Sequence, residues 1–543
     1  MIEKITILSN SYKEILEFQV QECKQIIDCS RVVEKKKTFD IEVEFTSRII
    51  SFRNHDYTWQ DLKKDRIANE YTSKIIKLED GTYVQANINQ GIWEINKKNP
   101  NVLVWKFNPE YSKPIAQYVG ETSQKQIFQA NTKLNFIENP TLLFSKTGAL
   151  EISRSTIPFS AIACFTDHCD FDTFPNLKLQ RQLFKETNIK VTKGFFLNHF
   201  SKRSNNASFE KEKDELDLWK NDGHEMCYHS LSQSIKSDEE SWSDFDKFNP
   251  PYNDVNVWID HGFQPYNFTL FSKNKIDKSA YENKLFSKNI NILWNYIDSG
   301  TSTKGIINQL NTSQFTLNNF YKGIKNFSLK TKIVQLLKNI IFHYDNDERR
   351  IRNYIDTITH AKNVIIKRKF SSIFLFLKNA IPLLKPIFKV IFFWNLEKNK
   401  PYKVAKYSPI LFKHTIFKKE FYIFQTLEMV DFKKALHQEN VNLLIEESGV
   451  FIAHTYFSVD MKHYSGKLFQ SQGKFDQEVL NNFKYLGSKI AENKIWNPTL
   501  SELITQFDIF DKTILDCDEN GTIFIKNNFN LIFRTVNNES YSN

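Results

Sequence analysis

The sequence lacks the features that mark several common protein classes. Only six of its 543 residues are cysteines, and none has the CxxC spacing, which argues against a disulfide framework and predicts free thiols in a reducing compartment. The first 18 residues carry Glu and Lys where a secretory leader needs an unbroken apolar core, so no signal peptide is expected. Together these absences predict a cytoplasmic protein.

A strong excess of charge of one sign is also missing. The net charge of +10 over 64.1 kDa is mild, and the basic residues are spread through the chain. The sequence contains no helix-turn-helix, zinc-finger or Gly-aromatic RNA-binding motif, so nucleic acid is not an expected partner. The mild positive balance favours anionic surfaces such as phospholipid headgroups.

The length and the residue pattern predict two or three domains. Residues 1–150 contain alternating runs such as FDIEVEF and turns such as Asp80-Gly81, which indicate a mainly-β, sandwich-like domain. Over residues 151–510, short apolar strands alternate with polar helical stretches, which is typical of an α/β fold with parallel strands. Residues 511–543 include DENGTIFIKNN and are expected to form a β-hairpin and a tail.

Residues 310–430 are rich in lysine and predict a helical insertion. Within them, the segment 368–398 is dense in Phe, Leu and Ile, but no 18-residue span is free of charge and proline, so a transmembrane helix is not expected. One interpretation is a helix pair in a membrane interface, at the inner face of the membrane, with Lys378, Lys385 and Lys389 reaching the headgroups. The other is an amphipathic hairpin packed on the domain and broken at its prolines.

Acidic and histidine side chains collect at five predicted strand ends. They occur in CFTDHCDFDT (164–173), DGHEMCYHSLSQ (222–233), VWIDHGFQPYN (257–267), LWNYIDSG (293–300) and FIAHTYFS (451–458). Active sites of β/α folds gather where parallel strands reach their carboxyl edge. One histidine at a strand end is usually a satisfied polar group, but five such segments in order predict a shared site.

These segments resemble, in the same order, the motifs of the polysaccharide deacetylase family, the NodB-type carbohydrate esterases. Members of that family carry a strand-end TFDDG, a GHE followed by HTxSH, an RPPYG-like segment, a segment with aspartate and tryptophan, and a late histidine. The resemblance covers about residues 157–510, with 310–430 as an insertion. It implies a NodB-like distorted (β/α) barrel, with the N-terminal 150 residues outside it.

The resemblance also implies roles for particular residues. Asp167 would be the catalytic base, and His454 the catalytic acid that protonates the leaving group. His168, Asp170 and His229 would hold a divalent metal, and a mixture of imidazole and carboxylate ligands suits Zn.

Two positions depart from the family pattern. Gln233 stands where the second metal-binding histidine is expected, and Phe263 stands where the arginine is expected. The metal shell would therefore have to be rebuilt. A shift of a few positions in the first motif would exchange the roles of Asp167, His168 and Asp170.

Further residues of the same segments are predicted to bind the substrate. Asp260 and His261 would supplement the metal shell or contact the sugar. Tyr266 would help to hold the oxyanion, and Trp258 and Trp294 would offer flat faces to a sugar ring. Core packing is at least as good an interpretation of either tryptophan.

The resemblance implies a hydrolase that removes an acyl group from a sugar in cell-surface polysaccharide or lipid-linked glycan metabolism, by metal-assisted amide or ester hydrolysis. Two alternatives stay open. One is a catalytically degenerate deacetylase fold that binds carbohydrate, because positions 233 and 263 are replaced. The other is a scaffold protein of a surface-polysaccharide system that binds partners through its N-terminal sheet.

Overall fold

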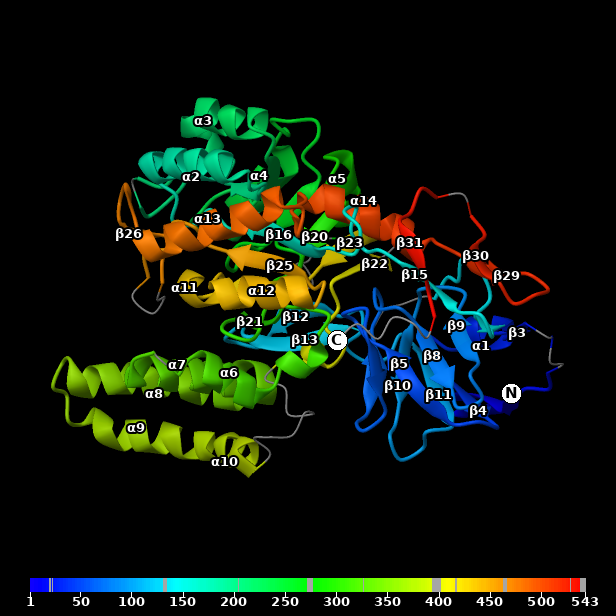
Figure 1. The fold of residues 1–543 in the computed structure, drawn as a ribbon. Helices are drawn as coiled ribbons and strands as arrows, with labels where there is room; N and C mark the ends of the chain where they lie inside the picture. Colours follow the sequence, from blue (N-terminus) through cyan, green and yellow to red (C-terminus); the bar gives the residue numbers. More distant parts are fainter. Residues whose placement is uncertain are drawn as a thin grey trace.

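The computed structural model contains an N-terminal all-β region, a large curled sheet flanked by helices, and a separate layer of helices, as Figure 1 shows. The described residues are 1–18, 21, 23–129, 134–203, 205–270, 277–325, 327–392, 402–415, 418–461, 466–527 and 529–537.

Two antiparallel sheets share one apolar core in the N-terminal region. One sheet has the order β2 (Tyr12–Ile15), β1 (Ile2–Ser9), β4 (Phe39–Phe45), β11 (Val102–Phe107), β10 (Ile92–Ile95) and β7 (Arg66–Ala68). The other has the order β3 (Lys24–Ile26), β14 (Thr141–Ser145), β9 (Tyr83–Ala86), β8 (Ile75–Leu78), β5 (Ile49–Arg53) and β6 (Trp59–Asp61), and the short helix α1 (Ser30–Lys35) follows β3. Strand β4 alternates between buried and half-buried side chains, as FDIEVEF predicts. The predicted all-β N-terminal region is confirmed.

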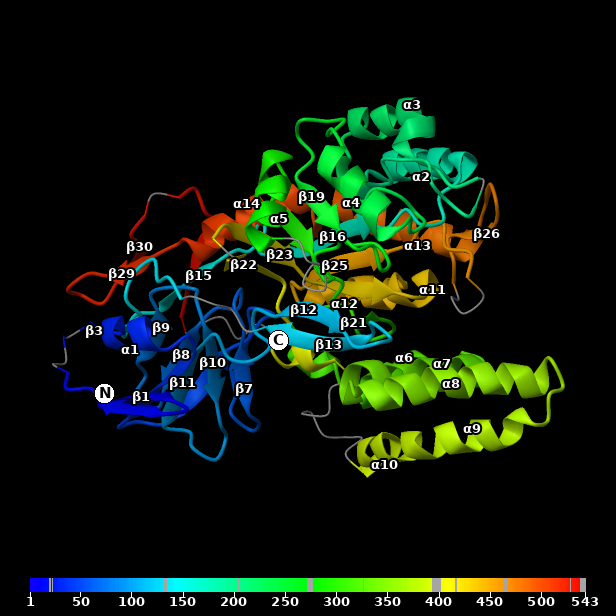
Figure 2. The same cartoon turned by 180° about the vertical axis from the view of Figure 1, so that it is seen from behind.

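One hairpin of the first 150 residues leaves this sandwich. Strands β12 (Ile115–Val119) and β13 (Lys125–Gln129) pair only with each other among the described strands and lie against the curled sheet in Figures 1 and 2. The Tyr118 hydroxyl donates to the carbonyl of Tyr296 at 2.8 Å, and the Tyr118 amide donates to the carbonyl of Thr269. The predicted boundary at residue 150 therefore does not separate the two regions in space.

The central sheet is parallel except at one edge. Its order is β21 (Asp298–Ser302), β24 (Thr426–Met429), β25 (Val450–Thr455), β16 (Ala161–Asp167), β17 (Thr192–Phe195), β18 (Glu225–Tyr228), β19 (Val257–Ile259), β20 (Ile292–Trp294), β23 (Glu420–Phe424) and β22 (Leu411–Thr415), and β28 (Ile495–Trp496) also pairs with β16. Among the described strands of this sheet, only β22 runs antiparallel to its neighbour. Every residue of β16 is buried, as expected for a parallel strand covered on both faces.

The sheet curls strongly on itself. Strand β20 lies near one end of the strand order, yet residues 295–297 alone connect it to β21 at the other end. Likewise, a single residue, Gln425, connects β23 to β24. Because three extended residues span only about 10 Å, the two ends of the sheet must lie close together. The coarse prediction of an α/β fold is confirmed, with the sheet forming a curled half-barrel.

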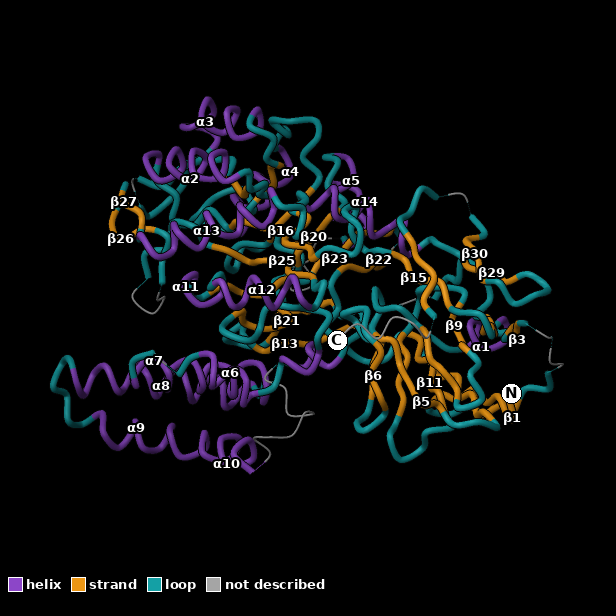
Figure 3. The backbone as a smooth tube through the Cα atoms, viewed as in Figure 1, coloured by secondary structure: helices purple, strands orange, loops and turns teal. Residues whose placement is uncertain are grey.

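Helices pack around this sheet, as Figure 3 shows in purple. They are α2 (Phe174–Thr187), α3 (Phe209–Asn221), α4 (Asp238–Lys247), α5 (Lys278–Ser287), α11 (Phe432–Ala435), α12 (Gln438–Glu446), α13 (Gln477–Ala491) and α14 (Leu500–Asp511). The N-termini of α4 and α14 are fixed by capping boxes begun by Ser237 and Thr499. The small hairpin β26 (Phe469–Ser471) and β27 (Lys474–Phe475) precedes α13.

The helical insertion lies between β21 and β22. It contains η2 (Thr312–Gln314), α6 (Leu317–Gly323), α7 (Leu329–Lys338), the π-helical segment η3 (Asn339–Asp345), α8 (Glu348–Ile365), α9 (Ser372–Ala380), η4 (Ile381–Leu383), α10 (Leu384–Phe392) and η5 (Lys403–Lys406). It ends earlier than the predicted boundary at 430, because residues 411–429 form three strands of the sheet. Residues 393–398 of the predicted interfacial segment lie outside the described residues. Among the described helices, none has both the length and the apolar character to cross a bilayer.

The predicted C-terminal hairpin is present and packs on the N-terminal sandwich. Strands β29 (Leu515–Cys517) and β30 (Ile523–Ile525) pair around a turn at residues 518–521. Lys24 on β3 holds Asp516 at 2.9 Å. The last described strand, β31 (Phe533–Val536), pairs with β15 (Ala149–Ile152), so residues 533–536 lie against the connection between the two regions.

Candidate functional site

The predicted histidines and aspartates collect at the carboxyl ends of neighbouring parallel strands. Asp167 ends β16 and is followed by His168 and Asp170, His229 directly follows β18, and His454 lies near the end of β25. The centroid of the His168 ring lies 4.6 Å from that of His229 and 3.9 Å from that of His454. Side chains from three distant parts of the chain therefore form one cluster.

Three of these residues could hold a metal ion together. One ligand atom from each of His168, Asp170 and His229 lies within 4.8 Å of the other two, and all three residues are buried. Imidazole nitrogen and carboxylate oxygen are ligands that Zn and other first-row divalent metals accept. The three residues predicted as metal ligands are thus brought to one place.

The two histidines that contact Asp170 each face two hydrogen-bond acceptors, one more than a neutral imidazole can serve. The two carboxylate oxygens of Asp170 lie 2.9 Å from His229 Nε2 and 2.9 Å from His261 Nδ1. The other nitrogen of each ring also faces an acceptor, which is the backbone carbonyl of Ile259 for His229 and that of Gln233 for His261. A neutral imidazole has a single N–H, so each ring must either carry a charge or share one contact with a cation.

His229 and His261 differ in their expected protonation state. Burial would lower the pKa of His261, but the Asp170 carboxylate raises it above its ordinary value, so His261 is suited to be an imidazolium. Burial lowers the pKa of His229 despite the same carboxylate, so His229 stays neutral. A neutral His229 can donate to only one of its two acceptors, and a cation bound between Nε2 and Asp170 would allow Nδ1 to donate to the carbonyl of Ile259.

Within the described part of the chain, neither ring nitrogen of His168 has a hydrogen-bond partner, although the side chain is buried. Burial, and after it the neighbouring His454 and His229, keep the pKa of His168 far below its ordinary value, so the ring is neutral. A buried polar group normally has a partner. One of these two nitrogens is available to bind a metal ion, whereas the other lacks the hydrogen-bond acceptor that a metal-ligating histidine usually has.

His454 forms a second unit with Asp298. Its Nδ1 lies 3.1 Å from Oδ1 of Asp298, and the Thr426 hydroxyl donates to the same oxygen at 2.7 Å. Trp294 Nε1 donates to the Thr426 oxygen at 2.9 Å, which fixes the hydroxyl. Burial would lower the pKa of His454, but Asp298 raises it above its ordinary value. Its Nε2 has no hydrogen-bond partner among the described residues.

Asp167 lies in a different environment from the one expected of a general base. Lys193 Nζ donates to one of its oxygens, and also to Asp172 at 2.6 Å and to Gln180 at 3.1 Å. The other oxygen accepts from the backbone amide of Phe457 at 3.3 Å. Burial raises the pKa of Asp167 to about 6 even beside the lysine. Asp167 is therefore part of a buried ion cluster.

Three of the predicted substrate-binding residues lie inside the protein. Asp260 is fully buried and accepts hydrogen bonds from Trp258 Nε1 and from the amides of Phe268 and Thr269. Tyr266 is buried among aromatic side chains of the core. The indole of Trp258 packs in the same core, so its faces meet other side chains. These three residues hold the fold together around the site.

The other two predicted substrate-binding residues belong to the cluster. His261 contacts Asp170, as described above. The ring of Trp294 meets the rings of His168 and His454 edge to face, with centroids 4.8 and 4.9 Å apart. Gln233, at the position of the expected second histidine, instead accepts hydrogen bonds from Ser201 and Ser234.

A pocket of about 530 Å³ opens beside His454 and Asp298. Its walls come from the curled sheet, from the β12–β13 hairpin and from the helical insertion. Many of its lining side chains are aromatic, among them Tyr118, Trp294, Tyr296, Tyr354, Tyr402 and Tyr456, and Phe263 also lines it. Charged residues of both signs complete it, namely Asp298, Glu428, Lys338 and Lys403. The pocket has the mixed aromatic and polar lining typical of small-molecule sites.

Neither Lys193 nor Glu428 is predicted by the sequence motifs. Lys193 is the only charged residue of its strand, TKGF, and Glu428 is the only charged residue of TLEM. A single charge in an otherwise uncharged strand was the sequence signal that could have identified both residues. Cys169 and Cys227, by contrast, are buried thiols whose pKa burial keeps well above the ordinary value, as expected of small core residues. The six cysteines, all within the described residues, are free.

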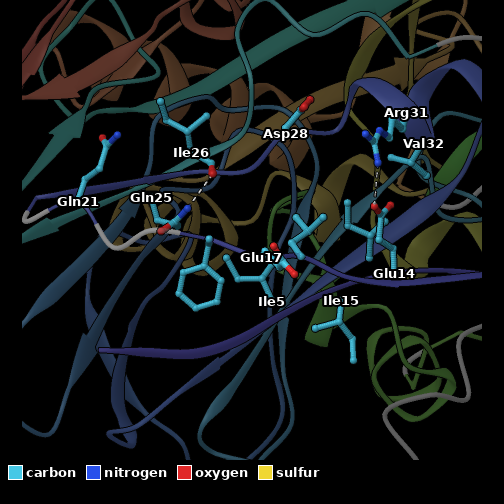
Figure 4. A pocket seen from close by; sticks show the side chains of 13 residues that line it. Ile5, Glu14, Ile15, Glu17, Gln21, Gln25, Ile26, Asp28, Arg31 and Val32 are labelled. Carbon is cyan, nitrogen blue, oxygen red and sulfur yellow. Dashed lines mark hydrogen bonds and ion pairs between the residues drawn. The ribbon is translucent and has the colours of Figure 1, made fainter.

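A second hollow, of about 570 Å³, lies at the edge of the N-terminal sandwich and is shown in Figure 4. Its described lining includes Glu14, Glu17, Asp28 and Arg31, and Arg31 pairs with Glu14. None of its described lining residues is a histidine or a cysteine, so it lacks the ligand chemistry of the strand-end cluster.

No protein-family model, curated protein or solved structure gives a significant match to this chain. The chemistry of the site therefore has to be inferred from its own residues.

Proposed function

We propose that this protein is a metal-dependent hydrolase of the polysaccharide deacetylase type, which removes an acyl group from a sugar. The observation that carries the proposal is the buried convergence of His168, Asp170 and His229 beside the His454–Asp298 pair, at the edge of a pocket. Metal-dependent hydrolysis of an amide or ester uses a Lewis acid and a group that transfers protons, and the cluster offers a place for each.

We further propose that the curled sheet is a NodB-like distorted barrel. Support comes from the order of the strand-end segments and from the short connections that bring the two ends of the sheet together. The site also lies at the carboxyl edge of the strands, where enzymes with parallel β/α sheets place their catalytic groups.

His168, Asp170 and His229 are the proposed holders of the metal, with Zn as the preferred ion. The unpartnered nitrogens of His168, and the short contact between Asp170 and His229 Nε2, support this fit. A divalent ion bound there supplies a Lewis acid that polarises an acyl oxygen and promotes the ionisation of water. His261 holds the second oxygen of Asp170 and so orients that carboxylate.

His454 is the proposed proton-transfer group. Asp298 accepts from its Nδ1, which leaves Nε2 as the nitrogen that takes a proton from water and returns it to the leaving amine or alcohol. Asp167 is less suited to this role, because Lys193 and the amide of Phe457 occupy its oxygens. Its proposed part is to hold the end of β16 in place.

The pocket is the proposed sugar site. Aromatic rings stack on the apolar faces of sugar rings, while charged and amide groups bind hydroxyls, and this pocket has both kinds of side chain. Trp294 borders the pocket and also touches His168, but its side chain is almost completely buried, so it connects the pocket to the proposed metal ligands without offering a face to a sugar.

Metal content is the first test. The purified full-length protein should contain about one equivalent of a transition metal by elemental analysis, or take it up after dialysis against Zn²⁺. His229→Ala should lose it, whereas His224→Ala should keep it, because His224 is a buried histidine that only accepts a hydrogen bond from the Val191 amide. A wild-type protein that neither contains nor takes up metal would refute the proposal.

Activity is the second test, with release of acetate from acetylated oligosaccharides as the readout. His454→Gln should abolish turnover and leave the metal content unchanged, because His454 is not among the proposed ligands. If His454→Gln remained fully active, the assignment of proton transfer to His454 would be wrong.

A degenerate, carbohydrate-binding member of the same fold is the second candidate. The observation that favours it is the Lys193–Asp167 ion pair, which occupies the residue that the family resemblance assigns as base. This candidate expects retention on a carbohydrate affinity matrix with no bound metal, so the metal measurement separates the two.

A further inference from the structure

The outer face of the helical insertion carries a long exposed apolar stripe. Helices α9 and α10 follow each other through the short turn η4, and the views in Figures 1 and 2 place them as the outermost layer, on the far side of α7 and α8 from the curled sheet. Along them, six large apolar side chains recur every three or four residues: Phe374, Leu377, Ile381, Leu384, Phe388 and Phe392. They are between 47% and 82% exposed.

The spacing puts all six on one side of the helix. At about 100° per residue they fall within a sector roughly 80° wide. The opposite side is already used, since Leu383 and Val390 are buried and Ile387 packs against the core. The hairpin is thus fixed to the protein by its inner stripe, and none of the six side chains of the outer stripe belongs to the hydrophobic core of the described residues. A contiguous exposed apolar surface of this kind marks an interaction site.

The charged residues around the stripe indicate the kind of surface that it binds. Residues 366–392 contain six basic side chains and no acidic one. Lys378, Lys385 and Lys389 are exposed and lie along one flank of the stripe, roughly 60° to 100° from its centre. An apolar stripe flanked by lysines is complementary to a surface that has an apolar interior below anionic groups. A second copy of the chain would place these cations against each other, which opposes self-association through this face.

We propose that α9, η4 and α10 bind the surface of a bilayer that contains anionic phospholipids. The helices lie in the plane of the interface, with the phenylalanines among the acyl chains and Lys378, Lys385 and Lys389 at the phosphates. The insertion also forms one wall of the pocket, through η3, α8 and η5. Docking through α9 and α10 therefore holds that pocket close to the membrane surface. The inference rests on the exposed stripe and its charge, and it stands whether or not the site is catalytic.

Flotation of the full-length protein with vesicles tests the proposal. The wild type should float with vesicles of phosphatidylcholine and phosphatidylglycerol at low salt, and should bind pure phosphatidylcholine vesicles far more weakly. The triple variant Lys378→Gln, Lys385→Gln and Lys389→Gln should lose on the order of 100-fold in partitioning, since each lysine near an anionic surface contributes roughly fivefold. Phe374→Gln with Phe388→Gln should reduce binding at least about tenfold.

A matched control uses exposed phenylalanines elsewhere. Phe524→Gln with Phe533→Gln changes two exposed phenylalanines outside the insertion, and it should bind vesicles like the wild type. All variants alter exposed side chains, and circular dichroism verifies that they fold. The proposal is overturned if the wild type fails to float with anionic vesicles at low salt. It is also overturned if the control variant loses as much binding as the Phe374 and Phe388 variant. A third contrary result is a wild type that does not bind vesicles but forms a stable dimer, which the Phe374 and Phe388 changes dissociate.

Discussion

Replacing Lys193 by methionine would remove the only cation that the structure places between Asp167 and Asp172. Lys193 Nζ contacts both carboxylates, and it also lies 5.0 Å from the centre of the Trp219 ring. The side chains of the lysine and both aspartates are at most 2% exposed, so water cannot take the place of the ammonium group. The variant would have to fold with two buried carboxylates and no counter-ion.

The size of the effect follows from this geometry. Removing one partner of a buried ion pair typically costs about 3–5 kcal/mol of unfolding free energy, because the remaining charge is left without compensation. Lys193 serves two carboxylates, so we expect a loss at or above the upper end of that range. Against the roughly 5–15 kcal/mol that stabilises a typical domain, such a loss would be visible as a large shift of the urea midpoint.

Urea unfolding followed by circular dichroism measures the loss. Lys190→Met is the matched control, because Lys190 is three residues away but forms a half-exposed pair with Glu502, for which we expect only about 0–1 kcal/mol. Adding Asp167→Asn to Lys193→Met should restore part of the stability, since it removes one of the two uncompensated charges. Equal effects of Lys193→Met and Lys190→Met would refute the reasoning.

Two further changes test the surroundings of the site. Burial lowers the pKa of His343 to about 3, and its ring stacks on Tyr402 with the centroids 4.3 Å apart. Because only the unfolded chain binds this proton, the contribution of His343 to stability should be complete well above about pH 6.5 and fall by about 2 kcal/mol between pH 7 and pH 5. Other buried histidines with a lowered pKa, such as His224, add their own falls. His343→Phe should show a smaller fall in urea unfolding, and an unchanged pH dependence would contradict this. Gly194→Ala should destabilise the protein and reduce its metal content, because a Cβ there would overlap the backbone carbonyl of Asp167; wild-type stability in that variant would show that β16 and β17 can move apart.

The sequence was a good guide to local structure and to the identity of the metal-capable residues. The alternation in FDIEVEF predicts strand β4, and the apolar run before Asp167 predicts the buried strand β16. Five strand-end segments predict a shared site, and four of them supply His168, His229, His261 and His454 to one cluster. These features depend on residue type and short-range spacing, which the chain states directly.

Other features depended on how the strands pair. Asp167 and Lys193 are opposite each other in the parallel pair of β16 and β17, and nothing in the residues around either one predicts that register. Likewise, Asp298 meets His454 only because β24 lies between β21 and β25. Trp258 and Tyr266 stand in motif-like segments, yet they point into the core.

The sequence by itself determined which segments form strands or helices and which side chains are able to bind a metal, because hydrophobic periodicity and ligand chemistry are properties of neighbouring residues. Only the tertiary structure decided which carboxylate is neutralised by a lysine, which histidine keeps unpartnered nitrogens, and which face of the insertion stays exposed. Those outcomes depend on contacts between residues far apart in the chain, and burial then sets the cost of every charge and every unpaired polar atom.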